Sequence, residues 1–142
     1  MRKSFSCAFL NFLTLFSLLL LTACEKDRLY ESTYIYGVFA ILGDSPAFAF
    51  FDDYLALKGI SGGVTWTTRT FKSETKSEND QKAIALFNEQ IAKIDEEELK
   101  ELFKGENIAF VYGVEISPYG WPGSRLASKI YQFGSYAQSM SE

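Results

Sequence analysis

The hydrophobic residues of this chain change their spacing along the sequence, and that change constrains the fold most. In the segment from residue 84 to residue 94, apolar residues recur at steps of three and four positions: Ile84, Phe87, Ile91 and Ile94. Such steps place side chains along one stripe of an α-helix. From residue 108 to residue 116, apolar or aromatic residues instead alternate with Ala109, Val111, Gly113 and Glu115, which is typical of a β-strand. The chain therefore combines helices and strands.

Further segments complete the predicted fold. Aromatic and aliphatic runs predict additional strands at residues 34–42, 47–50 and 64–71. Residues 126–136 fit a helix or a closing strand, and their Ile, Tyr and Phe content favours the strand. We therefore expect an α+β fold, an antiparallel sheet of four or five strands with a helical pair (about 78–104) packed on one face. One globular domain would span residues 33–142.

Capping residues mark the start of both predicted helices. Ser77, with Asp80 three residues later, predicts the start of the first helix. Asp95 predicts the start of the second, and three glutamates follow it in the first turn. Carboxylates there favour the positive end of the helix dipole, so we prefer this structural explanation of the acidic run to a cation site.

The beginning of the chain has the layout of an export signal. Arg2 and Lys3 give a positively charged start, and residues 12–21 are almost wholly apolar. A retained membrane anchor is one alternative, because residues 5–23 are just long enough to cross a bilayer. Ordinary secretion is a second alternative. The export signal and both alternatives place the rest of the chain outside the cytoplasm.

The apolar stretch is followed by Leu21, Thr22, Ala23 and Cys24, which resemble the lipobox of bacterial lipoproteins. The resemblance covers the first 24 residues and implies a signal peptide over residues 1–23, lipid on the Cys24 thiol, and a lipidated tether over residues 24–32. Glu25 rather than an aspartate follows the cysteine, which resembles lipoproteins sorted to the outer membrane rather than retained in the inner one. The resemblance thus implies a lipid-anchored envelope protein on the periplasmic or the surface face of that membrane.

The composition limits the chemistry of the domain. Histidine is absent from the sequence, which removes the usual general base and the commonest metal ligand. Cys7 lies in the signal peptide and Cys24 would be acylated, so no thiol would remain for catalysis, zinc or a disulfide. We therefore expect no metal and no cofactor. The formal net charge of −4 argues against a nucleic-acid partner, which requires a basic patch.

The segment from residue 117 to residue 125 is the candidate site for a protein partner. Tyr119, Trp121 and Arg125 are of the residue types that most often anchor interfaces. Two prolines in the same segment lower the entropy that is lost on binding. The alternative is that Trp121 folds back and covers the sheet.

Carboxylates are the remaining option for catalysis. Asp52 and Asp53 are adjacent, and we expect them at a bulge or break of a strand, where they do not converge on a substrate. Glu115 shares a strand face with Ala109, Val111 and Gly113 and has Arg69 as a candidate partner; an ordinary ion pair or an exposed edge residue is the favoured interpretation. Two functional classes remain. We favour a non-catalytic binding or structural lipoprotein that recognises a protein partner over an envelope hydrolase that uses carboxylates on glycan or peptide.

Overall fold

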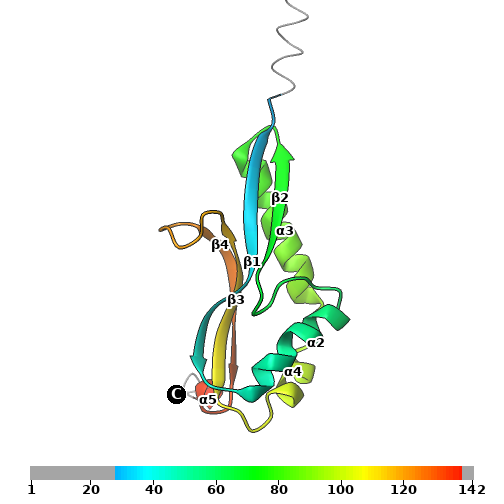
Figure 1. Cartoon of the computed structure of the whole chain (residues 1–142), viewed down its shortest axis with the longest axis vertical. Helices are drawn as coiled ribbons and strands as arrows, with labels where there is room; N and C mark the ends of the chain where they lie inside the picture. The colour runs from blue at the N-terminus through cyan, green and yellow to red at the C-terminus, as the bar shows by residue number, and fades with distance from the viewer. Residues whose placement is uncertain (1–27, 139–142) are drawn as a thin grey trace, which may run out of the picture.

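The computed structural model of the chain describes residues 28–138, which form an antiparallel sheet with helices packed on one face (Figure 1). The sheet has four strands in the order β2-β1-β3-β4: β1 Tyr30–Gly43, β2 Thr67–Ser73, β3 Ile108–Ile116 and β4 Arg125–Phe133. The predicted helical pair consists of α3 (Lys76–Ala92) and α4 (Glu96–Leu102). The α+β prediction is therefore confirmed, and β4 shows that the ambiguous segment at 126–136 contains a strand.

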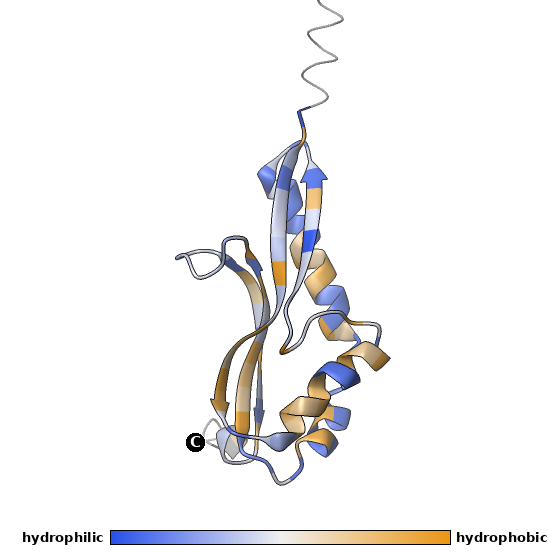
Figure 2. Ribbon diagram, viewed as in Figure 1, coloured by the Kyte–Doolittle hydropathy of each residue, from blue (hydrophilic) through white to orange (hydrophobic). Residues whose placement is uncertain are grey.

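The predicted signal peptide, Cys24 and the first residues of the tether lie outside the described part of the chain. The strand β1 begins at Tyr30, so the last three residues assigned to the tether belong to the sheet, where Tyr30 pairs with Ser73. Glu31 and Ser32 are polar and Tyr30 is exposed, in keeping with this end of the β1–β2 pair, which is largely hydrophilic (Figure 2). Among residues 28–138, no helix is long and apolar enough to span a membrane.

The strand predicted at residues 47–50 is wrong. Pro46–Phe50 is the 3-10 helix η1, and it continues directly into the helix α2, Phe51–Leu57. A proline occupies the start of η1, where its missing N–H leaves no helical hydrogen bond unmade. Phe51 and Leu55 lie four residues apart, and both are buried in the core. A short apolar run does not distinguish a strand from a buried helix by its spacing.

The helix α3 begins one residue before the predicted cap. Its N-cap is Thr75, whose side chain accepts a hydrogen bond of 3.2 Å from the backbone N–H of Glu78, so the prediction of Ser77 as the cap is wrong. The predicted cap at Asp95 is confirmed, because its carboxylate accepts from the N–H of Glu97 at 2.8 Å. Both caps satisfy N–H groups that have no partner inside their helix.

Three buried tyrosines hold α3 against the sheet. Their hydroxyls donate to atoms of this helix: Tyr34 to Asp80 Oδ1 at 2.6 Å, Tyr36 to the Ala83 carbonyl at 2.9 Å, and Tyr112 to Gln90 Oε1 at 3.4 Å. All three side chains are fully buried, and their burial raises the pKa of Tyr34 to about 12 and also raises the pKa values of Tyr36 and Tyr112. The hydrogen bonds offset the cost of burying the hydroxyls and fix the helix in place.

A cluster of phenylalanines fills the other end of the core, beneath α2 and α4. Their ring centroids lie 4.9–6.2 Å apart: Phe48, Phe51, Phe103, Phe110 and Phe133. Figure 2 shows the apolar colouring of β1 and β3 concentrated at this end of the sheet. The helices α2, α3 and α4 therefore cover one face of the sheet along its length and leave the opposite face open.

Candidate functional site

The face of the sheet away from the helices is here called the open face. Ile35 stands opposite Glu115, and Gly37 stands opposite Gly113, in the β1–β3 register. These positions alternate with the tyrosines that contact α3, and neighbouring strand residues point to opposite sides of a sheet. Glu115 and the two glycines therefore lie on the open face.

The loop 117–124 joins β3 to β4 and projects away from the helices (Figure 1). Its base is held by backbone hydrogen bonds of 2.8 Å, from Ile116 N–H to the Ser124 carbonyl and from Ser117 N–H to the Thr33 carbonyl. Trp121 is 68% exposed and Tyr119 is 53% exposed. Trp121 therefore does not cover the sheet, and that alternative is wrong.

Tyr119 packs against a tryptophan that belongs to a distant part of the sequence. The rings of Trp66 and Tyr119 meet edge to face with their centroids 4.6 Å apart, and Phe39 lies 5.3 Å from Trp66 on the other side. The sequence places Trp66 in a strand at 64–71, but β2 begins only at Thr67. Trp66 and Phe39 were missed as members of the site because their proximity to the loop depends on the sheet order.

The position of Trp66 follows from the end of β2. The first residue of β2, Thr67, pairs with Tyr36, so β1 extends beyond β2 at Val38. The Val38 N–H donates instead to the Gly63 carbonyl at 2.8 Å, and the Val38 carbonyl accepts from Trp66 Nε1 at 2.9 Å. The indole N–H thus bonds a β1 carbonyl that has no hydrogen-bond partner in β2.

A glycine makes room for the indole on the open face. A Cβ at Gly37 would overlap the Cδ1 atom of Trp66. A side chain at this position would therefore displace the ring from β1 and separate it from Tyr119. The sequence indicates that Gly37 makes room for Trp66 only once the strands that pair with β1 are known.

Arg125, the third residue predicted for the site, lies beside these aromatic rings. Its guanidinium lies over the Phe39 ring, 5.5 Å from the centroid, and its Nε is 3.4 Å from Glu115 Oε1. Glu115 is 5% exposed, whereas the Arg125 side chain is 42% exposed. The predicted partner Arg69 is wrong, because Arg69 stands opposite Tyr34 and therefore lies on the helix side of the sheet.

These contacts join Phe39, Trp66, Tyr119 and Arg125, and Trp121 is exposed on the same loop as Tyr119; the five residues are here called the aromatic surface. The loop adds an open, apolar hollow of about 350 Å³, the loop pocket, which is lined by Ile116, Pro118, Trp121, Pro122, Gly123 and Ser124. The predicted candidates Tyr119 and Arg125 are thus joined by two residues from other elements, Trp66 and Phe39, whereas Trp121 is exposed and lines the loop pocket.

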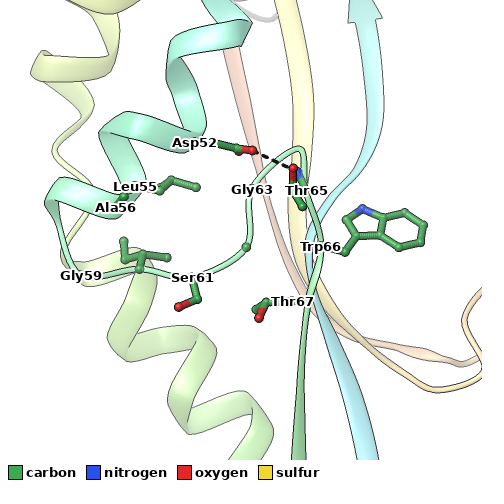
Figure 3. Close-up of a pocket in the computed structure, with 11 residues that line it drawn as sticks. Asp52, Leu55, Ala56, Gly59, Ser61, Gly63, Thr65, Trp66 and Thr67 are labelled. Atoms are coloured by element: carbon green, nitrogen blue, oxygen red, sulfur yellow. Dashed lines mark hydrogen bonds between the residues drawn. The ribbon is translucent and has the colours of Figure 1, made fainter.

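A second hollow, of about 480 Å³, lies between α2 and the glycine-rich segment that follows it (Figure 3). Asp52 lines it, but its carboxylate accepts from the backbone N–H groups of Val64 at 2.7 Å and Thr65 at 3.2 Å. Figure 3 shows the Trp66 indole pointing away from this hollow. Asp52 and Asp53 lie in the first turn of α2, so the predicted strand bulge is wrong, and Asp52 braces the segment.

The glutamates that follow Asp95 make ion pairs at the protein surface. Glu98 pairs with Lys58 at 2.6 Å, and Glu96 pairs with Lys129 at 2.7 Å. Hydrogen bonds from these lysines lower the pKa values of both carboxyls. Among residues 28–138, no group of three His, Cys, Asp or Glu side chains is placed to hold a metal ion. The described carboxylates therefore do not converge in either hollow.

Comparison of the chain with protein-family models, with curated proteins and with solved structures gives no match.

Proposed function

We propose that this chain is a lipid-anchored lipoprotein of the bacterial envelope whose domain is non-catalytic and binds a protein partner through the aromatic surface. The exposure of Trp121 and Tyr119, on a loop that projects away from the helices, carries this proposal. Grouped exposed aromatic side chains are typical of interaction sites, and Trp, Tyr and Arg dominate binding hot spots.

The proposed anchor rests on the lipobox resemblance that ends at Cys24. Replacement of the thiol by a hydroxyl removes the nucleophile that takes the lipid, so Cys24→Ser should abolish labelling by a fatty-acid probe and leave the uncleaved precursor. Equal labelling of the wild type and this variant would contradict the proposal. An outer-membrane location rests on Glu25 and is tested by membrane fractionation of the labelled protein.

The anchor would keep the aromatic surface near the bilayer. The loop 117–124 is hydrogen-bonded to Thr33, which is nine residues after Cys24. Nine extended residues span at most about 30 Å. We therefore expect the partner to be a protein of the same membrane, or one that meets the domain close to it.

The envelope hydrolase remains the alternative proposal, and fewer observations support it. Such an enzyme needs carboxylates that face a substrate in a cleft. Asp52 braces a backbone segment, and Glu115 is buried beneath Arg125. A hydrolytic activity that Glu115→Gln abolishes without unfolding the domain would favour this alternative.

The partner is tested by cross-linking and capture from envelope extracts with the detergent-solubilised lipidated chain. Trp121→Ala should weaken capture by about 2 kcal/mol or more, the scale of a hot-spot residue. Leu57→Ala is the matched control, because Leu57 is an 87% exposed apolar residue on α2, outside the aromatic surface. Capture that is equal for the wild type and Trp121→Ala would contradict the proposed site.

A further inference from the structure

Part of the strand β1 has a strand partner on one side only. β2 pairs with β1 as far as Tyr36, whereas β3 pairs with it as far as Gly43. The N–H and C=O of Val38 bond to the segment that precedes β2, and a register shift between Val38 and Ala40 bends the strand there. Among residues 28–138, no strand pairs with the β2 side of residues 39–43, here called the β1 edge.

The side chains of the β1 edge are apolar on both faces of the sheet. Ile41 is 46% exposed and stands opposite Phe110, a core residue, so it lies on the helix side. Leu42, the next residue, is 62% exposed and lies on the open face. Figure 2 shows this end of β1 in the apolar colour. A strand added here would therefore have apolar neighbours on both of its faces, and their burial would stabilise the pairing.

The absence of charge distinguishes the β1 edge from the outer strands of the sheet. Natural sheets protect their edge strands against further pairing with charged side chains, especially lysine. β2 carries Arg69 and Lys72, and β4 carries Arg125 and Lys129. The sequence from residue 38 to residue 43 contains no charged residue. The β1 edge therefore lacks this protection, and an uncharged segment suits it best, because burying a charge beside apolar side chains is costly.

We propose that the partner adds an extended, uncharged segment of its chain to the β1 edge as a further strand. This inference rests on the proposed function and states how the partner pairs with the domain. Continuity with the aromatic surface supports it, because Phe39 belongs to both and the Trp66 indole bonds the carbonyl of Val38, directly before the edge. Main-chain hydrogen bonds would supply affinity, and contacts with Ile41 and Leu42 would supply specificity.

A second copy of this chain fits the β1 edge less well than a strand of another protein. Two copies that pair through the same edge are related by a two-fold axis, so their β1 strands run antiparallel. The proposed lipid anchors precede β1, and they would therefore lie at opposite ends of such a pair. Both anchors could enter one membrane only if the pair lay flat on it. A strand of a different protein carries no such constraint.

The test uses short random peptides that are selected on the full-length chain in detergent, after binders of the detergent alone have been removed. One selected peptide is then synthesised with an N-methyl group on one residue at a time. An added strand directs the N–H groups of alternate residues toward β1. Methylation should therefore raise the Kd roughly tenfold or more at every second residue and leave it unchanged at the residues between them.

Lysine substitutions then locate the paired edge. Leu42→Lys places a charge on the β1 edge and should raise the Kd of the unmethylated peptide roughly tenfold or more. Ile130→Lys is the matched control and should leave the Kd unchanged, because Ile130 is also 62% exposed but lies on β4. Hydrogen exchange on the wild type gives a second readout. The amides of residues 39–43 should exchange more slowly in the complex, and those of β4 should not.

Three results would overturn the inference. These are an N-methyl scan without alternation, an equal Kd for the wild type and Leu42→Lys, and a dimer of the chain alone that Leu42→Lys dissociates, which would make a second copy the occupant. If Trp121→Ala abolishes partner capture and Leu42→Lys does not, the proposed function stands and strand addition is wrong. If Leu42→Lys alone weakens capture, strand addition stands and the aromatic surface is not the site. If neither variant changes capture, both proposals fail.

Discussion

Replacement of each tryptophan by alanine should destabilise the domain to a different degree. Trp66 is 40% exposed and Trp121 is 68% exposed. A tryptophan buries up to about 250 Å², so Trp66 removes roughly 150 Å² from water and Trp121 roughly 80 Å². At about 25 cal/mol/Å², these areas contribute at most about 4 and 2 kcal/mol, respectively. Loss of the hydrogen bond from Trp66 to the Val38 carbonyl adds about 1 kcal/mol.

Trp66→Ala should therefore cost about 3 kcal/mol more than Trp121→Ala, measured as the free energy of unfolding by urea denaturation followed by circular dichroism. In a thermal melt, the same difference corresponds to roughly 12 °C in Tm. Phe50 and Phe51 calibrate the scale, because these adjacent residues are 60% and 0% exposed. Phe51→Ala should cost about 3–5 kcal/mol and Phe50→Ala much less. Equal losses for the two tryptophan variants would refute the assignment of Trp121 as an exposed anchor.

Three further predictions concern the body of the domain. Chelator should leave the Tm unchanged, because no histidine is present and no described acidic cluster is placed to bind a metal; a fall of several degrees would reveal a carboxylate site. Asp52→Ala should cost about 1–3 kcal/mol in urea denaturation, and Asp53→Ala less than about 0.5 kcal/mol, because Asp52 accepts two backbone hydrogen bonds. Stability should be constant in mild alkali and fall from about pH 10 to 12, because burial raises the folded-state pKa of Tyr34 from 10.0 to about 12 and favours its neutral form. A free energy of unfolding that does not fall between about pH 10 and 12 would contradict this.

The parts of the fold that sequence predicted well have strong local patterns. The strand at 108–116 matches β3 residue for residue, because its alternation extends over the whole element. Residues 47–50 were wrongly predicted as a strand, because a short apolar segment fits the residue spacing of a strand and of a helix equally. The proline that precedes it was the available signal, because proline is favoured in the first turn of a helix.

The buried stripe of α3 shows a second limit of sequence patterns. Ile84 and Ile91 were predicted to face the core, but both are only partly buried, whereas Ala83 and Gln90 are buried. The helix is rotated because tyrosine hydroxyls of the sheet bond to the Ala83 carbonyl and to Gln90. A count of apolar residues does not include such polar contacts.

The candidate site also contains residues that the sequence predicted and residues that it did not. The loop residues Tyr119, Trp121 and Arg125 are close in sequence and were found together. Trp66 joins them through its hydrogen bond to the Val38 carbonyl and the space left by Gly37, and Phe39 packs against Trp66 and Arg125. These contacts depend on which strands are adjacent, and neither alternation nor composition contains that information.

The central position of β1 has a consequence for how the chain reaches its native state. β1 is the first element of the sheet in the sequence, yet it lies between β2 and β3. The pairing of β1 with β2 closes a modest loop. The other edge of β1 has no partner until Ile108–Ile116 is available, and this segment is far along the chain. Until then, the backbone N–H and C=O groups on that edge are open to pairing with another chain. A delay in delivering the last third of the polypeptide should therefore promote aggregation far more than a delay after β3 has emerged.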